Sequence, residues 1–410
     1  MKEMSEVKDT RTYIKNITDR HRYLESITVE HRSNNPKRDF LFVNKKQCKH
    51  IPCKASDMIK MCKTLANEVN TGLSKKDNYE DLKVLVIGFA ETATAIGTIV
   101  GNNVDKARFI LHTTREDVPG SEQVITFEET HSHATTQKLL VEKDSEFDFN
   151  NYNYILFVED EISTGNTILN FINAFETQHN LDKDGHKIRD IKYGVASVCN
   201  WQNKTMQRMF EVAGIDTFAL ITGEIDDIGV KMLDGTNIEV DTTVNDYNIG
   251  VYSGVTGIFP HENVFFENRT GHKVSRTERD ADMQSKFRQT TENICKQYKS
   301  VRVIGTEECM EPAIMLANML ESKGLDTVCH STTRSKIDVL KGSEDGIKSR
   351  YHVPSAYEFS RDTYIYNLEN KYDCTVLVTD STNGKQILAL YNALYNIIGG
   401  DTSKLMLVTL

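Results

Sequence analysis

Residues 155–169, ILFVEDEISTGNTIL, place two adjacent carboxylates, Glu159 and Asp160, directly after a run of apolar residues. A polar cluster follows before the chain becomes apolar again, and it consists of Ser163, Thr164, Gly165, Asn166 and Thr167. A turn from a buried strand into a helix points backbone N–H groups and the positive helix end outward, and glycine permits close approach, so this cluster favours a phosphate. The carboxylates suit hydroxyl donors or a cation. A ribose phosphate satisfies both groups, with its 5′-phosphate in the cluster and its 2′ and 3′ hydroxyls on the acids.

The elements that would position these residues alternate between strand and helix. Apolar runs separated by helices predict a parallel sheet covered on both faces, whose ligands bind beyond the carboxyl ends of the strands. In the first half we expect strands at 83–88, 107–113, 153–160, 191–200 and 215–223, and helices at 92–101, 166–178 and 201–214. The alternation resumes with strands at 300–305, 326–332, 373–380 and 403–410, and helices at 312–324 and 385–400.

The two halves read as a divergent repeat. VLVIGFAET corresponds to VRVIGTEEC, HTTR to HSTTR, and ILFVEDEISTGNTIL to TVLVTDSTNGKQIL. Gly88 and Arg115 are 27 residues apart, and Gly305 and Arg334 are 29 apart. The alternative is chance, because short apolar strands resemble one another in any sequence. We place the domain boundary near 255–275 and predict domains at 1–260 and 261–410, of which only the first carries the full set of functional groups.

A second turn falls at the same predicted sheet edge, after the strand at 83–88. It contains Phe89, Ala90, Glu91 and Thr92, and it does not fit the GxGxxG pattern of dinucleotide-binding folds. A tight strand-to-helix connection without a ligand is the alternative. The polar stretch after the strand at 107–113 is long enough to be a functional lid or a disordered loop. It contains Arg115, His131, His133 and Lys138, which offer positive charge or a proton.

The segment ILFVEDEISTGNT resembles the signature of type I phosphoribosyltransferases, which bind 5-phosphoribosyl 1-pyrophosphate (PRPP). Only Glu161 departs, because the family usually has an apolar residue there. The resemblance implies that Glu159 and Asp160 contact the ribose, that residues 163–167 bind the 5′-phosphate, and that residues 89–92 with Arg115 contact pyrophosphate. It also implies a flexible catalytic loop containing His131 and His133, a homodimer, and Mg²⁺ bound mainly through ligand oxygens, with no dedicated protein ligands.

More closely, FLFVNKKQCKHIP, GFAETATAIG, HTTREDVPG, FEETHSHAT and VEDEISTGNT resemble the orotate-phosphoribosyltransferase-like family of tellurite-resistance-associated gene clusters. Members carry a C-terminal domain known by a T-R-S-P motif. Here the motif reads TRSK at 333–336, so the proline is missing, while GTEECMEPA, YHVPSAYE, RDTYIYNL and VLVTD fit the pattern. The resemblance implies a Rossmann-like parallel sheet of the type I phosphoribosyltransferase kind and a second α/β domain that looks like a divergent copy.

Residues 36–54 resemble an amino-terminal hood over the acceptor base. The basic cluster Lys45, Lys46, Lys49 and His50 then favours an anionic acceptor, and a solvated basic strand edge is the alternative. In the second half, a different polar ligand is expected at the sheet edge, or a purely structural or dimerising role. The candidate residues there are Glu307, Glu308, Thr333, Arg334, Ser335 and Asp380.

Composition limits the function classes. The chain has 410 residues and a net charge of −10, which argues against broad phosphate neutralisation on nucleic acid. Eight scattered cysteines suggest reduced thiols, and we expect a cytoplasmic protein without a signal peptide or membrane span. The expected activity is transfer of a phosphoribosyl group from PRPP to a base-like nitrogen acceptor. The alternatives are a non-catalytic regulatory protein that binds PRPP or a nucleotide, and an enzyme that hydrolyses or rearranges a ribosyl phosphate.

Overall fold

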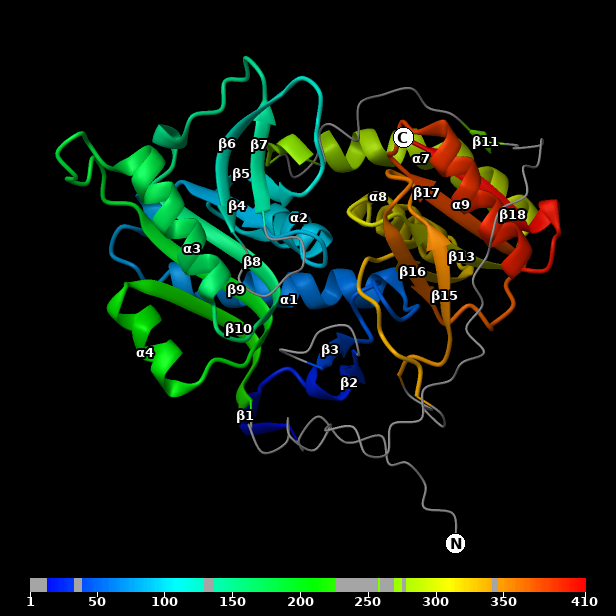
Figure 1. Cartoon of the computed structure of the whole chain (residues 1–410), viewed down its shortest axis with the longest axis horizontal. Helices are drawn as coiled ribbons and strands as arrows, with labels where there is room; N and C mark the ends of the chain where they lie inside the picture. Colours follow the sequence, from blue (N-terminus) through cyan, green and yellow to red (C-terminus); the bar gives the residue numbers. More distant parts are fainter. Residues whose placement is uncertain are drawn as a thin grey trace, which may run out of the picture.

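A computed structural model describes residues 13–32, 39–128, 136–225, 257–258, 269–274, 278–340 and 346–410. Two sheets of different size lie side by side, one in each half of the chain (Figure 1). The short helical turns are η2 (Leu24–Ser26), η3 (Tyr79–Asp81), η4 (Phe149–Asn151), the π-helical η5 (Glu176–Asn180) and η6 (Thr402–Lys404).

The first sheet has a parallel centre in the order β10-β9-β8-β4-β5. These strands are β4 (Val84–Gly88), β5 (Ala107–Thr114), β8 (Tyr154–Ile162), β9 (Lys192–Asn200) and β10 (Ile215–Ile225). Residues of β4 alternate between two apolar cores, because its side chains point to opposite faces of the sheet. One core includes α1 (Ala55–Leu73) and α2 (Thr94–Asn103), and the other includes α3 (Asn166–Phe175) and α4 (Lys204–Val212). The predicted parallel sheet covered on both faces is confirmed for these strands.

The edge strands of this sheet are antiparallel. The sheet is therefore mixed, whereas a purely parallel sheet was expected. β1 (Ile14–Asp19) pairs with β10, and β7 (Thr136–Glu142) pairs with β5 and with β6 (Ser121–Glu128). The polar stretch after β5 was predicted as a loop, yet much of it forms this hairpin. The physical reason is that Ile125, Phe127 and Leu139 bury their side chains in the core that contains α3.

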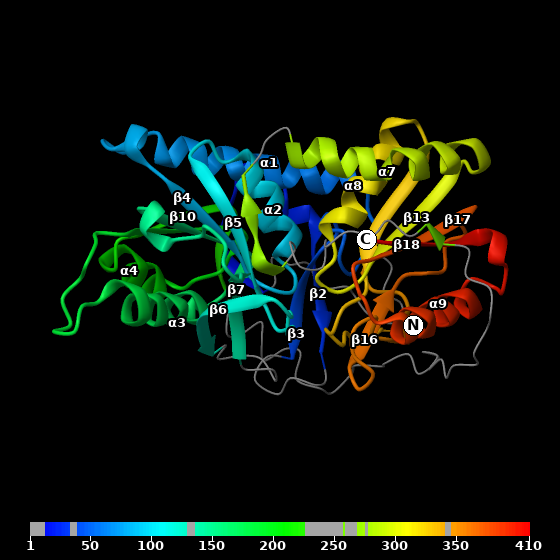
Figure 2. The same cartoon turned by 90° about the horizontal axis from the view of Figure 1, so that it is seen from above.

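The second sheet has the order β11-β18-β17-β13-β14. Its strands are β11 (Gly257–Ile258), β13 (Ser300–Gly305), β14 (Asp326–Ser331), β17 (Cys374–Thr379) and β18 (Leu405–Thr409). Helices α7 (Glu278–Gln297) and α8 (Glu311–Ser322) lie on the same side of the molecule as α1, and α9 (Gly384–Ile397) lies on the opposite side with α3 (Figure 2). A separate hairpin joins β15 (Arg350–Pro354) to β16 (Asp362–Tyr366).

Strand register supports the predicted repeat. β4 pairs with β5 and β8 in the same way that β13 pairs with β14 and β17. Gly88 lies opposite His112 and Val158, and Gly305 lies opposite Ser331 and Val378. Arg115 and Arg334 therefore occupy equivalent positions, three residues beyond these partners. Asp160 and Asp380 are equivalent by the same comparison, two residues beyond theirs.

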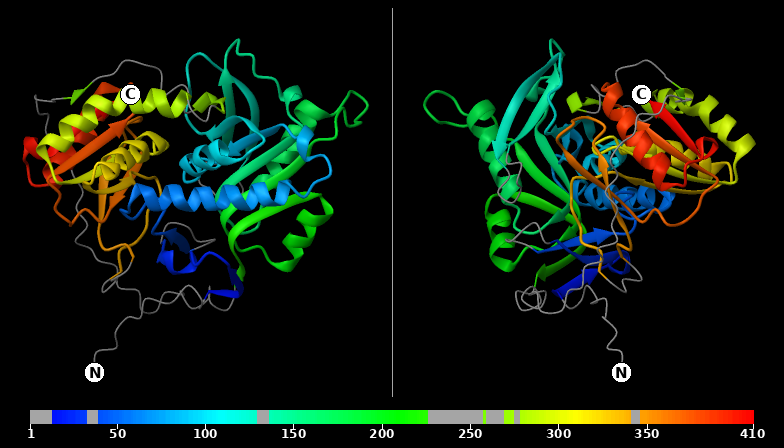
Figure 3. Two further views of the ribbon diagram at one scale, coloured as in Figure 1. Left: turned by 180° about the vertical axis from the view of Figure 1, so that it is seen from behind. Right: turned by 45° about the vertical axis from the view of Figure 1, so that its right-hand side comes forward.

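The chain crosses between the two sheets more than once near the boundary predicted at 260. β11 pairs with β18 of the second sheet, whereas β12 (His272–Lys273) pairs with β5 of the first. Near the amino terminus, the hairpin of β2 (Ile27–His31) and β3 (Phe40–Asn44) precedes α1. Helix α1 extends from the first sheet to the second half of the molecule, where it packs against α8 (Figure 3). These contacts join the two halves of the molecule.

Candidate active site

The acidic end of β8 lies against the first turn and the predicted hood. The carboxylate of Asp160 accepts hydrogen bonds from Thr92 Oγ1 at 3.1 Å and from Gln47 Nε2 at 3.2 Å. Gln47 Nε2 also donates to the carbonyl oxygen of Thr92 at 3.1 Å. Enclosure of its carboxyl group raises the pKa of Asp160, although these two hydrogen bonds act in the opposite direction. Glu159, beside it, is partly exposed.

The polar cluster after β8 forms a tight turn into α3. Gly165 precedes the helix with a φ of 75°, a left-handed conformation that favours glycine. A Cβ atom at this position would lie 2.4 Å from Phe210 Cζ and 2.8 Å from Gln202 Nε2, so the back of the turn is closely packed. Thr164 Oγ1 accepts a hydrogen bond from the backbone N–H of Asn166 at 3.3 Å. Ser163, Asn166 and Thr167 are partly exposed, as phosphate-binding residues need to be.

In the first turn, Phe89 and Ala90 can contribute only backbone groups to a ligand site. The Phe89 ring is buried against Phe127, Phe157 and Phe171, with centroid distances of 5.9, 5.9 and 6.1 Å. The peptide bond between Ala90 and Glu91 is cis, and the N–H of Ala90 donates to Thr113 Oγ1 at 2.8 Å. The core and the end of β5 therefore hold the turn at residues 89–92 in place.

Lys49 and Glu91 form a buried ion pair, with 2.5 Å between Lys49 Nζ and Glu91 Oε1. Lys49 Nζ also donates to the carbonyl oxygens of Glu307 at 2.8 Å and Thr332 at 3.1 Å, both in the second domain. Burial acts to raise the pKa of Glu91, but the charges of Lys49 and Arg334 prevail and lower it to about 2. The three donors of Lys49 are thus all engaged within the protein, at the domain interface.

His50 is buried as well, and its Nε2 has no hydrogen-bond partner among the described residues. Burial, with a smaller effect of the Lys49 charge, lowers the pKa of His50 to about 3. Burial contradicts the solvated strand edge for Lys49 and His50, whereas their contact with an acceptor stays a prediction. Lys45 and Lys46 remain partly exposed, and Lys46 Nζ lies 5.4 Å from the centroid of the Tyr23 ring.

The residues predicted after β5 have different placements. Arg115 is partly exposed, and its charge contributes to lowering the pKa of Glu91, so it lies near the first turn. Lys138 pairs with Asp117 at the protein surface. His131 and His133 lie outside the described residues.

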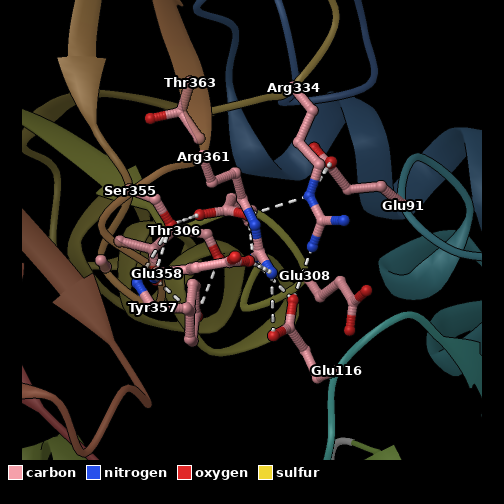
Figure 4. A network of polar contacts seen from close by, with 12 residues as sticks. Glu91, Glu116, Thr306, Glu308, Arg334, Ser355, Tyr357, Glu358, Arg361 and Thr363 are labelled. Atoms are coloured by element: carbon pink, nitrogen blue, oxygen red, sulfur yellow. Dashed lines mark hydrogen bonds and ion pairs between the residues drawn. The ribbon is translucent and has the colours of Figure 1, made fainter. Parts of the chain in front are cut away.

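The polar residues of the second sheet edge face the first domain (Figure 4). Glu308 Oε2 accepts from Thr114 Oγ1 at 2.8 Å and lies 3.4 Å from Arg269 Nε. Burial raises the pKa of Glu308 despite the nearby Arg269. Glu307 accepts from Ser355 Oγ at 2.6 Å, and Asp380 accepts from Tyr357 OH and from Arg269 Nη1, both at 2.6 Å. The second sheet edge is thus occupied by hydrogen bonds and ion pairs within the protein.

Arg334 and Arg361 connect the two domains. Arg334 contacts Glu307 at 3.0 Å, Glu116 at 2.5 Å and Glu91 at 3.6 Å. Arg361 contacts Glu116 at 2.7 Å and Glu307 at 2.8 Å. Thr333 and Ser335, the neighbours of Arg334, make hydrogen bonds that support the local backbone. The backbone groups of Thr333 exchange hydrogen bonds with those of Tyr364, and Thr333 Oγ1 accepts from the N–H of Ser335 at 3.2 Å.

Several residues of this arrangement were not identified from the sequence. They include Gln47 in the hood, Glu116 beside Arg115, and the second-domain residues Arg269, Ser355, Tyr357 and Arg361. The only available signal was their position in segments already singled out, such as HTTRED, YHVPSAYE and RDTYIYNL. Nothing in the residue types indicated that these segments would meet.

Comparison with known families accounts for both halves. Residues 27–224 match the model of a phosphoribosyl transferase family, and residues 268–406 match the TRSP domain that lies C-terminal to it. The chain belongs to this two-domain phosphoribosyl transferase family. No curated protein is significantly similar to it.

Solved structures with weak similarity are adenine phosphoribosyltransferases. The enzyme from Rhodothermus marinus has 10% identity and a TM-score of 0.31, with 49% of this chain and 96% of that chain covered. The Trypanosoma brucei enzyme, in complex with AMP, pyrophosphate and ribose-5-phosphate, has 9% identity and a TM-score of 0.32, with 50% and 78% covered. The Giardia lamblia enzyme, complexed with 9-deazaadenine, has 14% identity and a TM-score of 0.31, with 47% and 92% covered.

Arg334, the second residue of the TRSK sequence at 333–336, lies at the interface of the two domains, where it contacts Glu91. Within the described ranges, no helix is long and apolar enough to cross a membrane. The same part of the chain contains no group of three or more His, Cys, Asp or Glu side chains that could hold a metal ion.

Proposed function

We propose that the first domain transfers a 5-phosphoribosyl group from PRPP to a nitrogen atom of a base-like acceptor and releases pyrophosphate. The observation that carries this proposal is the contact between the acidic end of β8 and the first turn, made by Asp160 and Thr92 at 3.1 Å. It supports a site in which a carboxylate for the ribose and two turns for the phosphate groups lie at one sheet edge. Together, these three groups match the three charged and polar parts of the donor.

Each part of the site has a separate task. Residues 163–167 and the amino terminus of α3 bind the 5′-phosphate. Glu159 and Asp160 accept hydrogen bonds from the ribose hydroxyls and stabilise the positive charge that develops on the ring as the C1′–O bond breaks. Backbone groups of residues 89–92, together with Arg115, hold the departing pyrophosphate while the acceptor nitrogen forms the new bond to C1′. Partly exposed Lys45 and Lys46 favour an anionic acceptor.

The carboxylates at the end of β8 suit Mg²⁺, which prefers oxygen ligands. When bound, the ion would neutralise charge on the pyrophosphate. Donor oxygens and water would supply most of its ligands, and Glu159 and Asp160 would complete the set.

Asp160→Asn is the decisive variant. Removing one negative charge beside the ribose should reduce phosphoribosyl transfer by about 100-fold or more, because electrostatic groups at developing charges contribute that much. Transfer is measured as pyrophosphate release from PRPP and Mg²⁺ across a panel of neutral and carboxylated bases. Asp216→Asn is the matched control, since Asp216 lies near the start of β10 at the opposite sheet edge and accepts from Tyr154 OH at 2.7 Å.

Three results would reject the proposed function or the role of Asp160. Tight PRPP binding without release for any base identifies a regulatory protein that binds the donor. Release without an added base identifies a hydrolase or isomerase. Unchanged activity in D160N, with intact folding, removes this carboxylate from the mechanism.

A further inference from the structure

The carboxyl ends of the two sheets meet, and Arg334 lies where they do. By strand register it occupies the position in the second domain that Arg115 occupies in the first. Its Nε lies 3.6 Å from Glu91 Oε2, so the side chain reaches the turn at residues 89–92 (Figure 4). An anion bound by the backbone of that turn would therefore lie within reach of a residue from the other domain.

The guanidinium of Arg334 is held by only two of its three nitrogen atoms. Nε donates to Glu307 Oε2 at 3.0 Å, and Nη2 donates to Glu116 Oε1 at 2.5 Å. Nη1 makes no hydrogen bond or ion pair within the described ranges, and 20% of the side chain is exposed. A fixed guanidinium with one available edge is well suited to recognising an anion, because little conformational freedom remains to be lost on binding.

The two other arginines that the second domain contributes to this network, Arg361 and Arg269, do not offer such an edge. Arg361 uses Nη1 for Glu116 and Glu307, and Nη2 for Glu116 and Glu358. Arg269 is buried, with 1% of its side chain exposed, and pairs with Asp380. Arg361 therefore holds Glu116 and Glu307, the two carboxylates that bind Arg334. Arg269 instead pairs with Asp380 at the end of a strand of the second sheet.

The carboxylates near the turn are paired with cations before any ligand binds. Glu91, Glu116 and Glu307 contact three cations, which are Lys49, Arg334 and Arg361. Without these cations, Glu91 would repel a phosphate from its own turn. The second domain supplies two of the three, so the anion site at the turn is incomplete without that domain.

We propose that Arg334 of the TRSP domain binds the pyrophosphate end of the donor through Nη1, and that Glu116, Glu307 and Arg361 are positioning residues for its guanidinium. The two domains then form one composite site. The ligand class is a magnesium diphosphate, and its identification as part of PRPP rests on the proposed function.

The test uses the full chain and measures the affinity of inorganic pyrophosphate with Mg²⁺ by calorimetry. Arg334→Gln should weaken this affinity at least about tenfold, as expected for loss of a hydrogen bond between charged groups. The affinity for ribose 5-phosphate, which lacks the pyrophosphate, should stay within about twofold. Arg350→Gln is the matched control, because Arg350 is similarly buried in the same domain but pairs with Asp338 at 3.1 Å, away from the network.

A second variant covers the case in which R334Q does not fold. Arg334→Lys keeps the charge but cannot bridge two carboxylates and a ligand at once, so pyrophosphate affinity should fall about threefold or more with ribose 5-phosphate affinity unchanged. A folded R334Q or R334K that binds pyrophosphate as the wild type does would overturn the proposal. Equal loss of both affinities would also overturn it, because that result indicates general damage to the interface.

The positioning role of Glu116 has its own readout in a double-mutant cycle. Glu116→Gln should change pyrophosphate affinity at least about threefold in the wild-type background and have no effect in R334Q. The same factor in both backgrounds would reject the positioning role. If transfer occurs but R334Q binds pyrophosphate normally, the composite site fails and the proposed function stands. If pyrophosphate binding depends on Arg334 but no base is ribosylated, the composite site stands and the proposed function fails.

Discussion

At the scale of single residues, the Lys49–Glu91 pair has the strongest consequence for the site. Both side chains are buried, and Lys49 also donates to two carbonyl oxygens of the second domain. A buried charge without its partner is costly, commonly by about 3–5 kcal/mol, so neither member can be lost alone without strong destabilisation. The pair therefore fixes the side chain of Glu91 at the contact with the second domain.

His50, the neighbour of Lys49, predicts the pH dependence of stability. Its pKa is about 3 in the folded protein against an ordinary 6.5, so the unfolded chain binds more protons between these values. The free energy of unfolding should therefore fall as the pH decreases from about 6.5 toward 3, with a contribution from His50 of up to about 1.4 kcal/mol per pH unit. His50→Asn should reduce this slope.

The slope is measured by urea unfolding between pH 7.5 and 4.5, followed by the fluorescence of the single tryptophan, Trp201. Burial also lowers the pKa of His330, so a residual slope should remain in the variant. His186→Gln is the control, because this side chain is 80% exposed and its replacement should leave the slope unchanged. Identical slopes in wild type and H50N would show that His50 is not buried in its neutral form.

Residue types predicted the acids and the phosphate turn but not the buried interface. Glu159, Asp160 and residues 163–167 could be placed because strand, turn and helix follow one another within a short segment. Lys49 could not, because its acceptor Glu307 is 258 residues away in the sequence. A basic residue in a polar segment looks exposed until the segment that covers it is known.

At the scale of elements, the left-handed residue before α3, Gly165, decides how the turn at residues 163–167 is built. Gly165→Ala adds a Cβ that would lie 2.4 Å from Phe210 Cζ, which forces the turn or the ring to move. We expect affinity for ribose 5-phosphate to fall at least about tenfold, because the N–H groups of the turn would lose their alignment.

Gly185→Ala separates this effect from the cost of the backbone conformation. Gly185 has a φ of 80°, and a Cβ added there would meet no atom within 4 Å, so its alanine variant carries only the left-handed penalty of about 1–2 kcal/mol in stability. Calorimetry with ribose 5-phosphate and thermal unfolding distinguish the two variants. Equal affinity in G165A and G185A would mean that the packing behind the turn does not position it.

The central elements were predictable because their signals are local. Fully apolar strands such as β4 and amphipathic helices such as α3 show their periodicity in the sequence. The hairpins β6–β7 and β15–β16 were missed because short antiparallel strands give a weak periodic signal that apolar runs in other structures share. Their positions matter nonetheless, since Arg361, which directly precedes β16, reaches Glu116 of the first domain.

At the scale of the whole molecule, the repeat explains why polar sheet edges of the two halves meet. Two copies of a sheet that place polar residues at their carboxyl ends can bury those ends against each other only if the charges are complementary. Arginines of the second copy meet glutamates of the first at this interface. Spacing in the sequence predicted the repeat, but the facing arrangement of the copies depends on surface complementarity, which has no local signature.

Helix α1 predicts how the two halves depend on each other. Its N-cap residue, Lys54, has no capping side chain, and the carboxylate of Glu321 in α8 accepts from the N–H groups of Ala55 at 2.6 Å and Ser56 at 3.2 Å instead. The second domain thus caps a helix of the first. Glu321→Ala should lower the free energy of unfolding by about 1–2 kcal/mol, since it removes both a cap and a favourable charge at the helix start.

The same variant should lose hydrogen-exchange protection in the first turn of α1 and in α8 together, because the contact joins these two elements. Glu68→Ala is the matched control on α1, where Glu68 is partly exposed and pairs with His21 of the same domain at 2.9 Å. Its effect should stay near or below about 1 kcal/mol and leave α8 protected. Unchanged protection of residues 55–58 in E321A would show that the two domains do not stabilise each other through this helix.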